Sequence, residues 1–233
     1  MIKVFPSADD AVADIPSGAT IAIGGFFTCG TPTLLTRALA KRNIRNLTIV
    51  IQSFGVGADE VNELAENGQV SGVIGNYPFY RSVDRGNQHL FEKLVRSGKI
   101  KVEVYPMGTF VEKMRAGGAG IAAFYVPTGV GTLIAEGKET RIFNGREYIM
   151  ETALVPDFAL IHAWKGDYEG NLFYRKTARN YNVAMAMSAK ITIAEVEQLY
   201  QPGSIEPDII HTHGIYVKRV IRVDCLERPP SAT

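Results

Sequence analysis

A glycine-rich segment near the N-terminus has residue types that could bind an anionic or carbonyl-bearing group. Ile21 to Ile23 is an apolar run typical of a strand, and Gly24 and Gly25 follow it, where the backbone can turn without hindrance from a Cβ. Thr31 and Pro32 stand where a helix N-cap and a first helical residue are expected. This arrangement would direct backbone N–H groups and the positive end of a helix toward the occupant of the loop.

Two histidines, His211 and His213, are spaced so that both would lie on one face of a strand. A zinc site would need at least a third ligand, and none is spaced nearby. We therefore expect no metal site, with one histidine exposed and the other packed.

Arg175, Lys176 and Arg179 form a small basic cluster beside two tyrosines. The cluster could contact phosphates of a ligand or a carboxylate of a partner. A solvated surface or an intersubunit contact explains it equally well.

Gly55 and Gly57 follow an apolar run and precede a helical pattern, as the first glycines of a dinucleotide fingerprint would. Glu60 stands in place of the third glycine, so we do not expect a dinucleotide site. The sequence also lacks a Gly-x-Ser-x-Gly segment and the order of a Ser-His-Asp triad.

The elements that would position these residues alternate between strand and helix patterns. Strands are expected at 21–23, 47–51, 69–74 and 100–104, and helices at 9–15, 34–39, 59–67, 84–97 and 110–114. Such alternation with short joints predicts an α/β fold with an open, mostly parallel sheet and helices on both faces.

The second half of the chain has weaker periodicity. Asn144-Gly145 between two apolar runs is a strong signal for a two-residue hairpin. Further strands are expected at 158–164, 172–174, 191–196 and 215–221, and a helix at 183–189. We expect one domain over residues 1–223 and a loose tail over residues 224–233.

The composition narrows the class of protein. The formal net charge of +1 over 233 residues, with no run of Lys and Arg, argues against nucleic acid as a partner. No apolar run approaches the roughly 18 residues that a membrane span needs, so we expect no membrane association. The first residues lack the apolar segment of a signal peptide, and two distant cysteines give no disulfide framework. We expect a cytoplasmic protein.

The segment SGATIAIGGFFTCGTP at residues 17–32 resembles the family I coenzyme A transferases, specifically their A (α) subunits. The family pattern runs Asp/Asn-Gly, a short apolar run, Gly-Gly-Phe, three residues and Gly-x-Pro, and only Ser17 departs from it. The resemblance continues at 114–139, 157–182 and 206–221, and so covers nearly the whole chain.

That resemblance implies that the partner is a B (β) subunit, in an αβ or α2β2 assembly. It also implies a coenzyme A thioester and a small carboxylic acid as substrates, with no permanently bound cofactor. In this family the thioester is attacked by a glutamate of the B subunit, in a Ser-Glu-Asn-Gly segment. This chain has Ala65-Glu66-Asn67-Gly68 on an amphipathic helical pattern, so we expect Glu66 at the surface and no catalytic nucleophile in this chain.

The A subunits of 3-oxoacid enzymes contribute pocket residues, and this chain departs from the family pattern at three of those places. Residues 52–54 are Gln-Ser-Phe where Asn-Asn begins the usual loop, and residues 75–78 are Gly-Asn-Tyr-Pro where Ser-Ser-Tyr or Ser-Phe-Pro is common. Residues 106–108 are Pro-Met-Gly instead of Pro-Gln-Gly, and methionine cannot donate to a thioester oxyanion. The substrate-binding residues implied are Gly24, Gly25, Phe26, Gln52, Ser53, Phe54, Asn76, Met107 and Gly108.

Three functions remain open from the sequence. The first is transfer of coenzyme A from a short-chain acyl-CoA to a carboxylate such as a 3-oxoacid. The second is a decarboxylase of the glutaconyl-CoA or methylglutaconyl-CoA type, or a hydrolase, on the same fold, since Met107 and Phe54 would give a drier pocket. The third is a non-enzymatic acyl-CoA-binding module.

Overall fold

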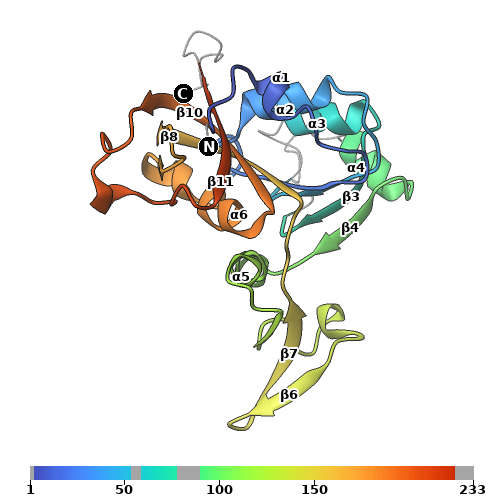
Figure 1. The fold of residues 1–233 in the computed structure, drawn as a ribbon. Coiled ribbons are helices and arrows are strands. Elements are labelled where there is room, and N and C mark those ends of the chain that lie inside the picture. The colour runs from blue at the N-terminus through green and yellow to red at the C-terminus, as the bar shows by residue number, and fades with distance from the viewer. Residues whose placement is uncertain (1–2, 54–58, 78–89, 224–233) are drawn as a thin grey trace.

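The computed structural model describes residues 3–53, 59–77 and 90–223. A twisted sheet forms the body of the molecule (Figure 1), with the strand order β11-β10-β8-β1-β2-β3-β4 and every neighbouring pair parallel. Its strands are β1 (Thr20–Ile23), β2 (Leu47–Val50), β3 (Val70–Gly75), β4 (Lys101–Val104), β8 (Phe158–Asp167), β10 (Ile191–Tyr200) and β11 (Val217–Arg222). The short β9 (Leu172–Phe173) pairs antiparallel with β8.

Helices cover both faces of this sheet, which confirms the predicted fold class. On one face lie α1 (Ala8–Ala11), α2 (Thr33–Ala40), α3 (Asp59–Glu66) and α4 (Leu90–Arg96), and on the other lie α5 (Met107–Gly118) and α6 (Asn182–Ser188), as Figure 1 shows. Short 3-10 helices are η1 (Leu133–Ala135), η2 (Lys176–Arg179) and η3 (Pro207–Ile209). Each face has its own hydrophobic core. Leu35 and Leu39 pack into the core under α1 to α4, and Phe110 and Met114 pack into the core under α5 and α6.

A second, smaller sheet projects from the body (Figure 1). It is antiparallel, in the order β5 (Ala123–Val126), β7 (Arg146–Thr152), β6 (Thr140–Phe143). The predicted hairpin is confirmed: Asn144 and Gly145 join β6 to β7 with φ values of 49° and 76°, the positive values that a type I′ turn needs.

Ion pairs of a buried glutamate connect the small sheet to α5. The carboxylate of Glu151 on β7 pairs with Lys113 Nζ at 3.1 Å and with Lys138 Nζ at 2.5 Å. Both ammonium groups also lie over the ring of Tyr105, at 4.3 and 5.2 Å from its centroid. The side chains of Lys113 and Glu151 are 5% and 2% exposed, so each depends on the other for compensation of its charge.

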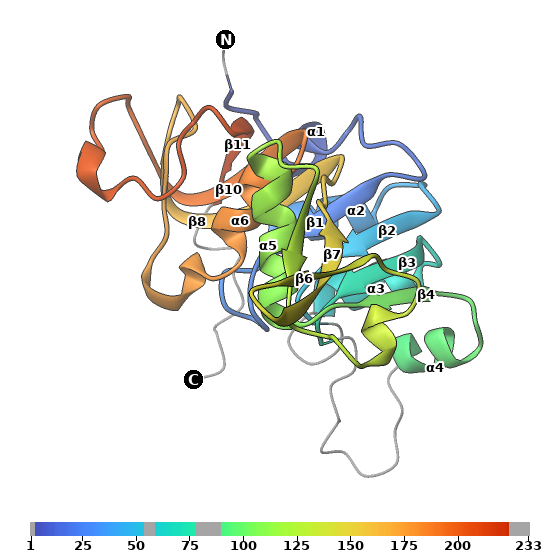
Figure 2. The same cartoon turned by 90° about the horizontal axis from the view of Figure 1, so that it is seen from below.

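The strand order reverses beside β1. The chain runs outward through β2, β3 and β4, then passes through α5 and the small sheet, and returns to place β8 on the other side of β1. Figure 2 shows α5 lying across the face of the main sheet, where it packs against α6. In open parallel sheets, ligands bind in the crevice outside the carboxyl ends of the strands at such a reversal.

Several expected boundaries differ from the structure. The first helix covers only Ala8–Ala11, and Asp14, which the expected helix included, lies beyond it and forms a two-point ion pair with Arg219. Strands β8 and β10 extend beyond their expected ends, since their final residues pair with each other as far as Tyr200 and Asp167. The glycine-rich stretch 117–137 contains β5 and η1, which its weak periodicity did not indicate.

Four sequence features lie outside the described residues: Phe54, the Gly55 and Gly57 pair, the expected helical residues 84–89, and the tail 224–233. Within the described ranges, no helix combines the length and the apolar character that crossing a membrane requires.

Asp157, the residue directly before β8, forms hydrogen bonds to β1 and to the residue directly before β10. Its Oδ2 accepts from Thr20 N at 2.9 Å, and its Oδ1 accepts from Lys190 Nζ at 2.8 Å. The hydrogen bond from the lysine, followed by that from the backbone N–H of Thr20, lowers the pKa of Asp157.

Candidate functional site

Loops that follow β1 and β2 meet at the carboxyl edge of the main sheet and bring four of the predicted pocket residues together. Gly24 and Gly25 follow β1, and Gln52 and Ser53 follow β2, and all four line one cavity of about 10 Å³. That volume holds about one water molecule. Gly25 has a φ of +108°, which a residue with a side chain rarely adopts.

The loop after β3 is joined to the loop after β2. Tyr77 N donates to Gln52 O at 3.0 Å, and Ser53 and Tyr77 form an isolated parallel bridge. These contacts place Asn76 beside the cavity wall that carries Gln52.

Two side-chain oxygens in these loops have no hydrogen-bond partner within the described part of the chain. They are Gln52 Oε1 and Asn76 Oδ1, and Gln52 is only 2% exposed. A buried polar atom without a partner costs about 1–3 kcal/mol, so such atoms are rare unless something else binds them. Both oxygens lie in loops at the strand reversal, where they are candidate acceptors for a hydrogen bond from a ligand.

Tyr181, at the N-terminus of α6, connects the predicted residues, and the sequence did not indicate it. Its hydroxyl accepts from Asn76 Nδ2 at 2.9 Å, and its ring stacks on Phe26 at 6.2 Å between centroids. Burial raises the pKa of Tyr181, so the hydroxyl keeps its proton at neutral pH and can donate it in a hydrogen bond. The only available signal was its place in the stretch 157–182 that resembles the family.

A groove of about 550 Å³ opens beside Tyr181. It is lined by Met107, Gly108, Val111, Glu112, Asn180 and Tyr181. Met107 and Gly108 form the first turn of α5, which follows β4, and Met107 is 53% exposed. The predicted residues that the structure describes therefore lie on one surface at the carboxyl ends of β1 to β4, where a small cavity and a separate groove are linked by the contacts of Tyr181 with Phe26 and Asn76.

The expectation that the N-terminus of α2 binds a ligand is wrong. Pro32, and not Thr31, holds the N-cap position, and the Thr31 hydroxyl donates to Phe27 O at 2.9 Å. The first N–H groups of α2 instead donate to Glu195 of β10, whose Oε2 lies 2.9 Å from Leu34 N and 3.1 Å from Leu35 N. A carboxylate oxygen from a distant strand, and not the Thr31 hydroxyl, therefore accepts from the first turn of α2.

Other candidate residues lie outside this surface. Glu66 is exposed on α3, as expected. His211 stacks on Phe173 at 4.7 Å between ring centroids, and His213 is exposed, which confirms one packed and one exposed histidine although neither lies in a strand. Among the residues that the structure places, no group of three or more potential ligands could hold a metal ion.

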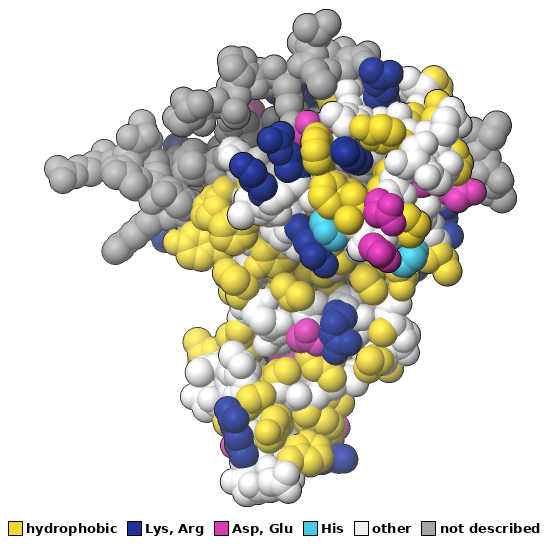
Figure 3. All heavy atoms as spheres, turned by 90° about the vertical axis from the view of Figure 1, so that its left-hand side faces the viewer, with side chains coloured by type: hydrophobic (Ala, Val, Ile, Leu, Met, Phe, Trp, Pro, Cys, Tyr) yellow, Lys and Arg dark blue, Asp and Glu magenta, His cyan; other side chains and the backbone are white. Residues whose placement is uncertain are grey.

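The basic cluster lies at the surface beside Trp164. Arg175, Lys176 and Arg179 are all exposed, and the guanidinium of Arg175 lies 5.1 Å from the centroid of the Trp164 ring. Figure 3 shows basic and acidic side chains mixed over the upper body, with hydrophobic side chains over much of the lower projection. Among the described residues, this cluster makes no hydrogen bond, ion pair or ring contact with a predicted pocket residue.

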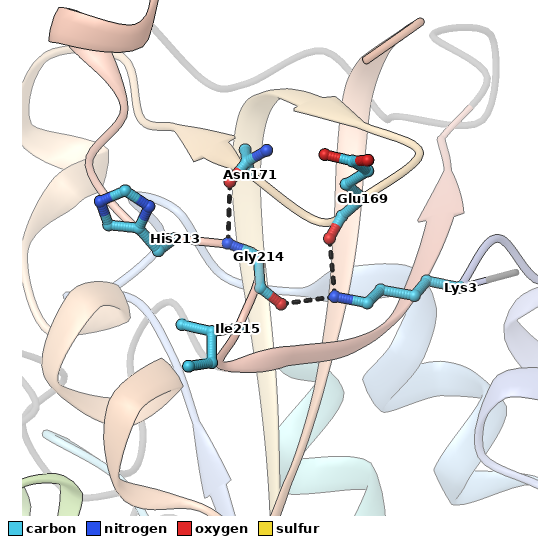
Figure 4. A pocket seen from close by; sticks show the side chains of 6 residues that line it. All are labelled: Lys3, Glu169, Asn171, His213, Gly214 and Ile215. Carbon is cyan, nitrogen blue, oxygen red and sulfur yellow. Dashed lines mark hydrogen bonds between the residues drawn. The ribbon is translucent and has the colours of Figure 1, made fainter. Parts of the chain in front are cut away.

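A second hollow, of about 400 Å³, lies between the turn that follows β8 and the segment before β11 (Figure 4). Lys3 Nζ donates to Glu169 O at 2.7 Å and to Gly214 O at 2.5 Å, and Asn171 Oδ1 accepts from Gly214 N at 2.9 Å. These hydrogen bonds hold the side chain of Lys3 against the turn that follows β8 and against the segment before β11.

Comparison with known proteins assigns the family. The sequence model of the family described as Coenzyme A transferase matches residues 5–222. The chain belongs to the coenzyme A transferase family.

The similarity to individual members of this family extends over nearly the whole chain. The chain is 44% identical over 228 residues to the A subunit of the succinyl-CoA:3-ketoacid coenzyme A transferase of Helicobacter pylori, covering 98% of this chain and 95% of the relative. It is 45% identical over 221 residues to the A subunit of the 3-oxoadipate CoA-transferase of Pseudomonas putida, covering 95% and 94%. Glutaconate coenzyme A-transferase from Acidaminococcus fermentans has the same fold, with a TM-score of 0.81 at 22% identity, covering 95% of this chain and 75% of that chain.

Proposed function

We propose that this chain is the A subunit of a heteromeric coenzyme A transferase that moves coenzyme A from a short-chain acyl-CoA to a 3-oxoacid. The observation that carries the proposal is the 44% identity, over nearly the whole chain, to a relative named as the A subunit of a succinyl-CoA:3-ketoacid transferase. The relative named as the A subunit of a 3-oxoadipate transferase points to the same class of acceptor.

The proposed reaction takes place on the B subunit. There, a glutamate carboxylate attacks the thioester carbonyl, and the thiolate of coenzyme A leaves as a mixed anhydride forms. The thiolate then attacks the glutamyl carbonyl, which releases the first carboxylate and leaves a glutamyl thioester. The 3-oxoacid carboxylate repeats these two steps in reverse order and departs as the new acyl-CoA.

This chain supplies the wall against which the acyl group lies. The acyl groups of succinyl-CoA and of 3-oxoacids only accept hydrogen bonds, so the Tyr181 hydroxyl is their donor. The unpartnered acceptors of Gln52 and Asn76 would instead meet amide N–H groups of the coenzyme A arm. Since the cavity at Gly24 and Gly25 holds only about one water molecule, we place the bulk of the substrate in the groove between Met107 and Tyr181.

The small sheet supports the proposal of a partner chain. Leu133 is 82% exposed and Ile142 is 70% exposed, and both lie on the projection formed by this sheet and η1. Large apolar side chains that are this exposed favour contact of the projection with another protein chain.

The test is to co-express the chain with a B subunit of the family and supply succinyl-CoA with acetoacetate or with 3-oxoadipate. We expect 3-oxoacyl-CoA to form in step with free succinate. Hydroxylamine or borohydride should inactivate the complex only after exposure to acyl-CoA, because only the glutamyl thioester reacts. Release of CO2 from glutaconyl-CoA without any transfer would refute the proposal in favour of a decarboxylase.

A further inference from the structure

The buried carboxylate of Glu195 joins three elements. The residue is 1% exposed, and its Oε2 accepts from the N–H groups of Leu34 and Leu35 at the start of α2. Its Oε1 lies 3.0 Å from His162 Nδ1 on the neighbouring strand β8. The other ring nitrogen of His162 lies 3.1 Å from Glu197 Oε1, so the imidazole that orients Glu195 is itself fixed at both ends.

Asn182 approaches the same loop from the opposite face of the sheet. Its Oδ1 accepts from His162 N at 3.3 Å, and its Nδ2 donates to Gly30 O at 3.0 Å. A Cβ on Gly24 would collide with the Asn182 side chain, so the loop and Asn182 are in close contact along its length. The loop from Gly24 to Thr31 is therefore held by Asn182 on one side and, through the first turn of α2, by Glu195 on the other.

We propose that Glu195, assisted by Asn182, is a positioning residue for the transfer reaction. The inference rests on the proposed function. Glu195 occupies the N-terminal N–H groups of α2, so the substrate meets only the side of the loop that carries Gly24, Gly25 and Phe26. Because reacting groups in an enzyme must be aligned closely, a displacement of about 1 Å in this loop is expected to lower the rate by roughly 10²-fold.

The experiment compares Glu195→Ala and Glu195→Gln with the wild-type complex of A and B subunits. We expect kcat per folded complex to fall by about 10²-fold in Glu195→Ala, with the KM for acyl-CoA changed less than about threefold. Glu195→Gln keeps an oxygen acceptor without the charge, so it should restore part of the rate. Hydrogen exchange of the segment 26–36 should rise in the order wild type, Glu195→Gln, Glu195→Ala.

Glu66→Gln is the matched control, since it removes a carboxylate that is exposed on α3. It should leave rate and exchange unchanged. If both Glu195 variants lower only the melting temperature, with kcat per folded complex and exchange of 26–36 as in the wild type, the inference is overturned. If Glu195→Ala does not fold, Glu195→Gln alone tests the positioning role. We then expect kcat of Glu195→Gln to fall by about tenfold.

The two proposals fail in different ways. A wild-type complex that transfers no coenzyme A contradicts the proposed function. The exchange of segment 26–36 is independent of turnover, and an unchanged value in the Glu195 variants contradicts the inference whatever the activity is.

Discussion

Replacing Gln52 with leucine should separate stability from activity. The side-chain oxygen of Gln52 is buried without a partner among the described residues, and such an atom costs about 1–3 kcal/mol. Leucine has a similar volume and no polar atom, so Gln52→Leu should stabilise the chain by about 1 kcal/mol or more. For a chain of this size, that corresponds to a rise of roughly 2–4 °C in melting temperature.

The same substitution should reduce turnover. If Gln52 accepts a hydrogen bond from the substrate, its loss removes about 1 kcal/mol of transition-state binding, or roughly a fivefold fall in kcat/KM. The assay is thermal unfolding of the complex, followed by initial rates of transfer over a range of acyl-CoA concentrations.

Gln69 provides the matched control. It is equally buried at 2% exposure, but its Nε2 donates to Arg42 O at 2.9 Å. Gln69→Leu should therefore destabilise the chain by about 1–3 kcal/mol and leave kcat/KM unchanged. The reasoning is refuted if Gln52→Leu destabilises the chain as much as Gln69→Leu does, or if it leaves kcat/KM at the wild-type value.

Three further substitutions test other contacts. Glu151→Ala leaves the buried ammonium of Lys113 uncompensated and should cost about 3–5 kcal/mol in urea unfolding, whereas replacing both residues with apolar ones should recover most of that loss. Tyr181→Phe removes the acceptor of the Asn76 amide but keeps the ring, so KM should rise several-fold and the unpartnered amide should cost about 1 kcal/mol, or roughly 2–4 °C in melting temperature. Asp157 has a pKa lowered in the folded state, so its contribution to stability is present above its unfolded pKa and is lost as the pH falls through the folded value. Asp157→Asn should therefore destabilise the chain at neutral pH by less than about 1 kcal/mol, because this ion pair is largely exposed, and the difference from wild type should vanish in acid.

Features set by neighbouring residues were predictable from the sequence. The turn at Asn144 and Gly145 depends on positive φ values that these two residues tolerate, and the structure confirms it. The apolar strands of the parallel sheet were found for a similar reason, since burial on both faces leaves a continuous apolar run. The strand β5 was missed because its residues are all half-buried and follow a glycine-rich turn, so they show no clear alternation.

The contacts that shape the candidate site were not predictable in this way. Glu195 stands in a run that predicts a strand, and nothing near it indicates that its carboxylate would reach α2. Tyr181 likewise meets Phe26 and Asn76 only through the packing of α6 on the sheet. Resemblance to a family located the loops, whereas their arrangement depends on hydrogen bonds between strands and helices that are distant in sequence.

The glycine loop and the residues that hold it are far apart in sequence. During synthesis the loop therefore leaves the ribosome well before those residues do. Leu34 and Glu195 are 161 residues apart, and Gly30 and Asn182 are 152 apart. At about 5–20 residues per second, a ribosome needs roughly 8–32 s to add the second partner after the first. Throughout that interval the N-terminus of α2 lacks the carboxylate of Glu195 and the loop lacks the side chain of Asn182, so the loop cannot take its final arrangement. The contacts of Tyr181 and Asn182 with the N-terminal loops therefore form only after residue 182 has been made, so these loops reach their final arrangement late in synthesis.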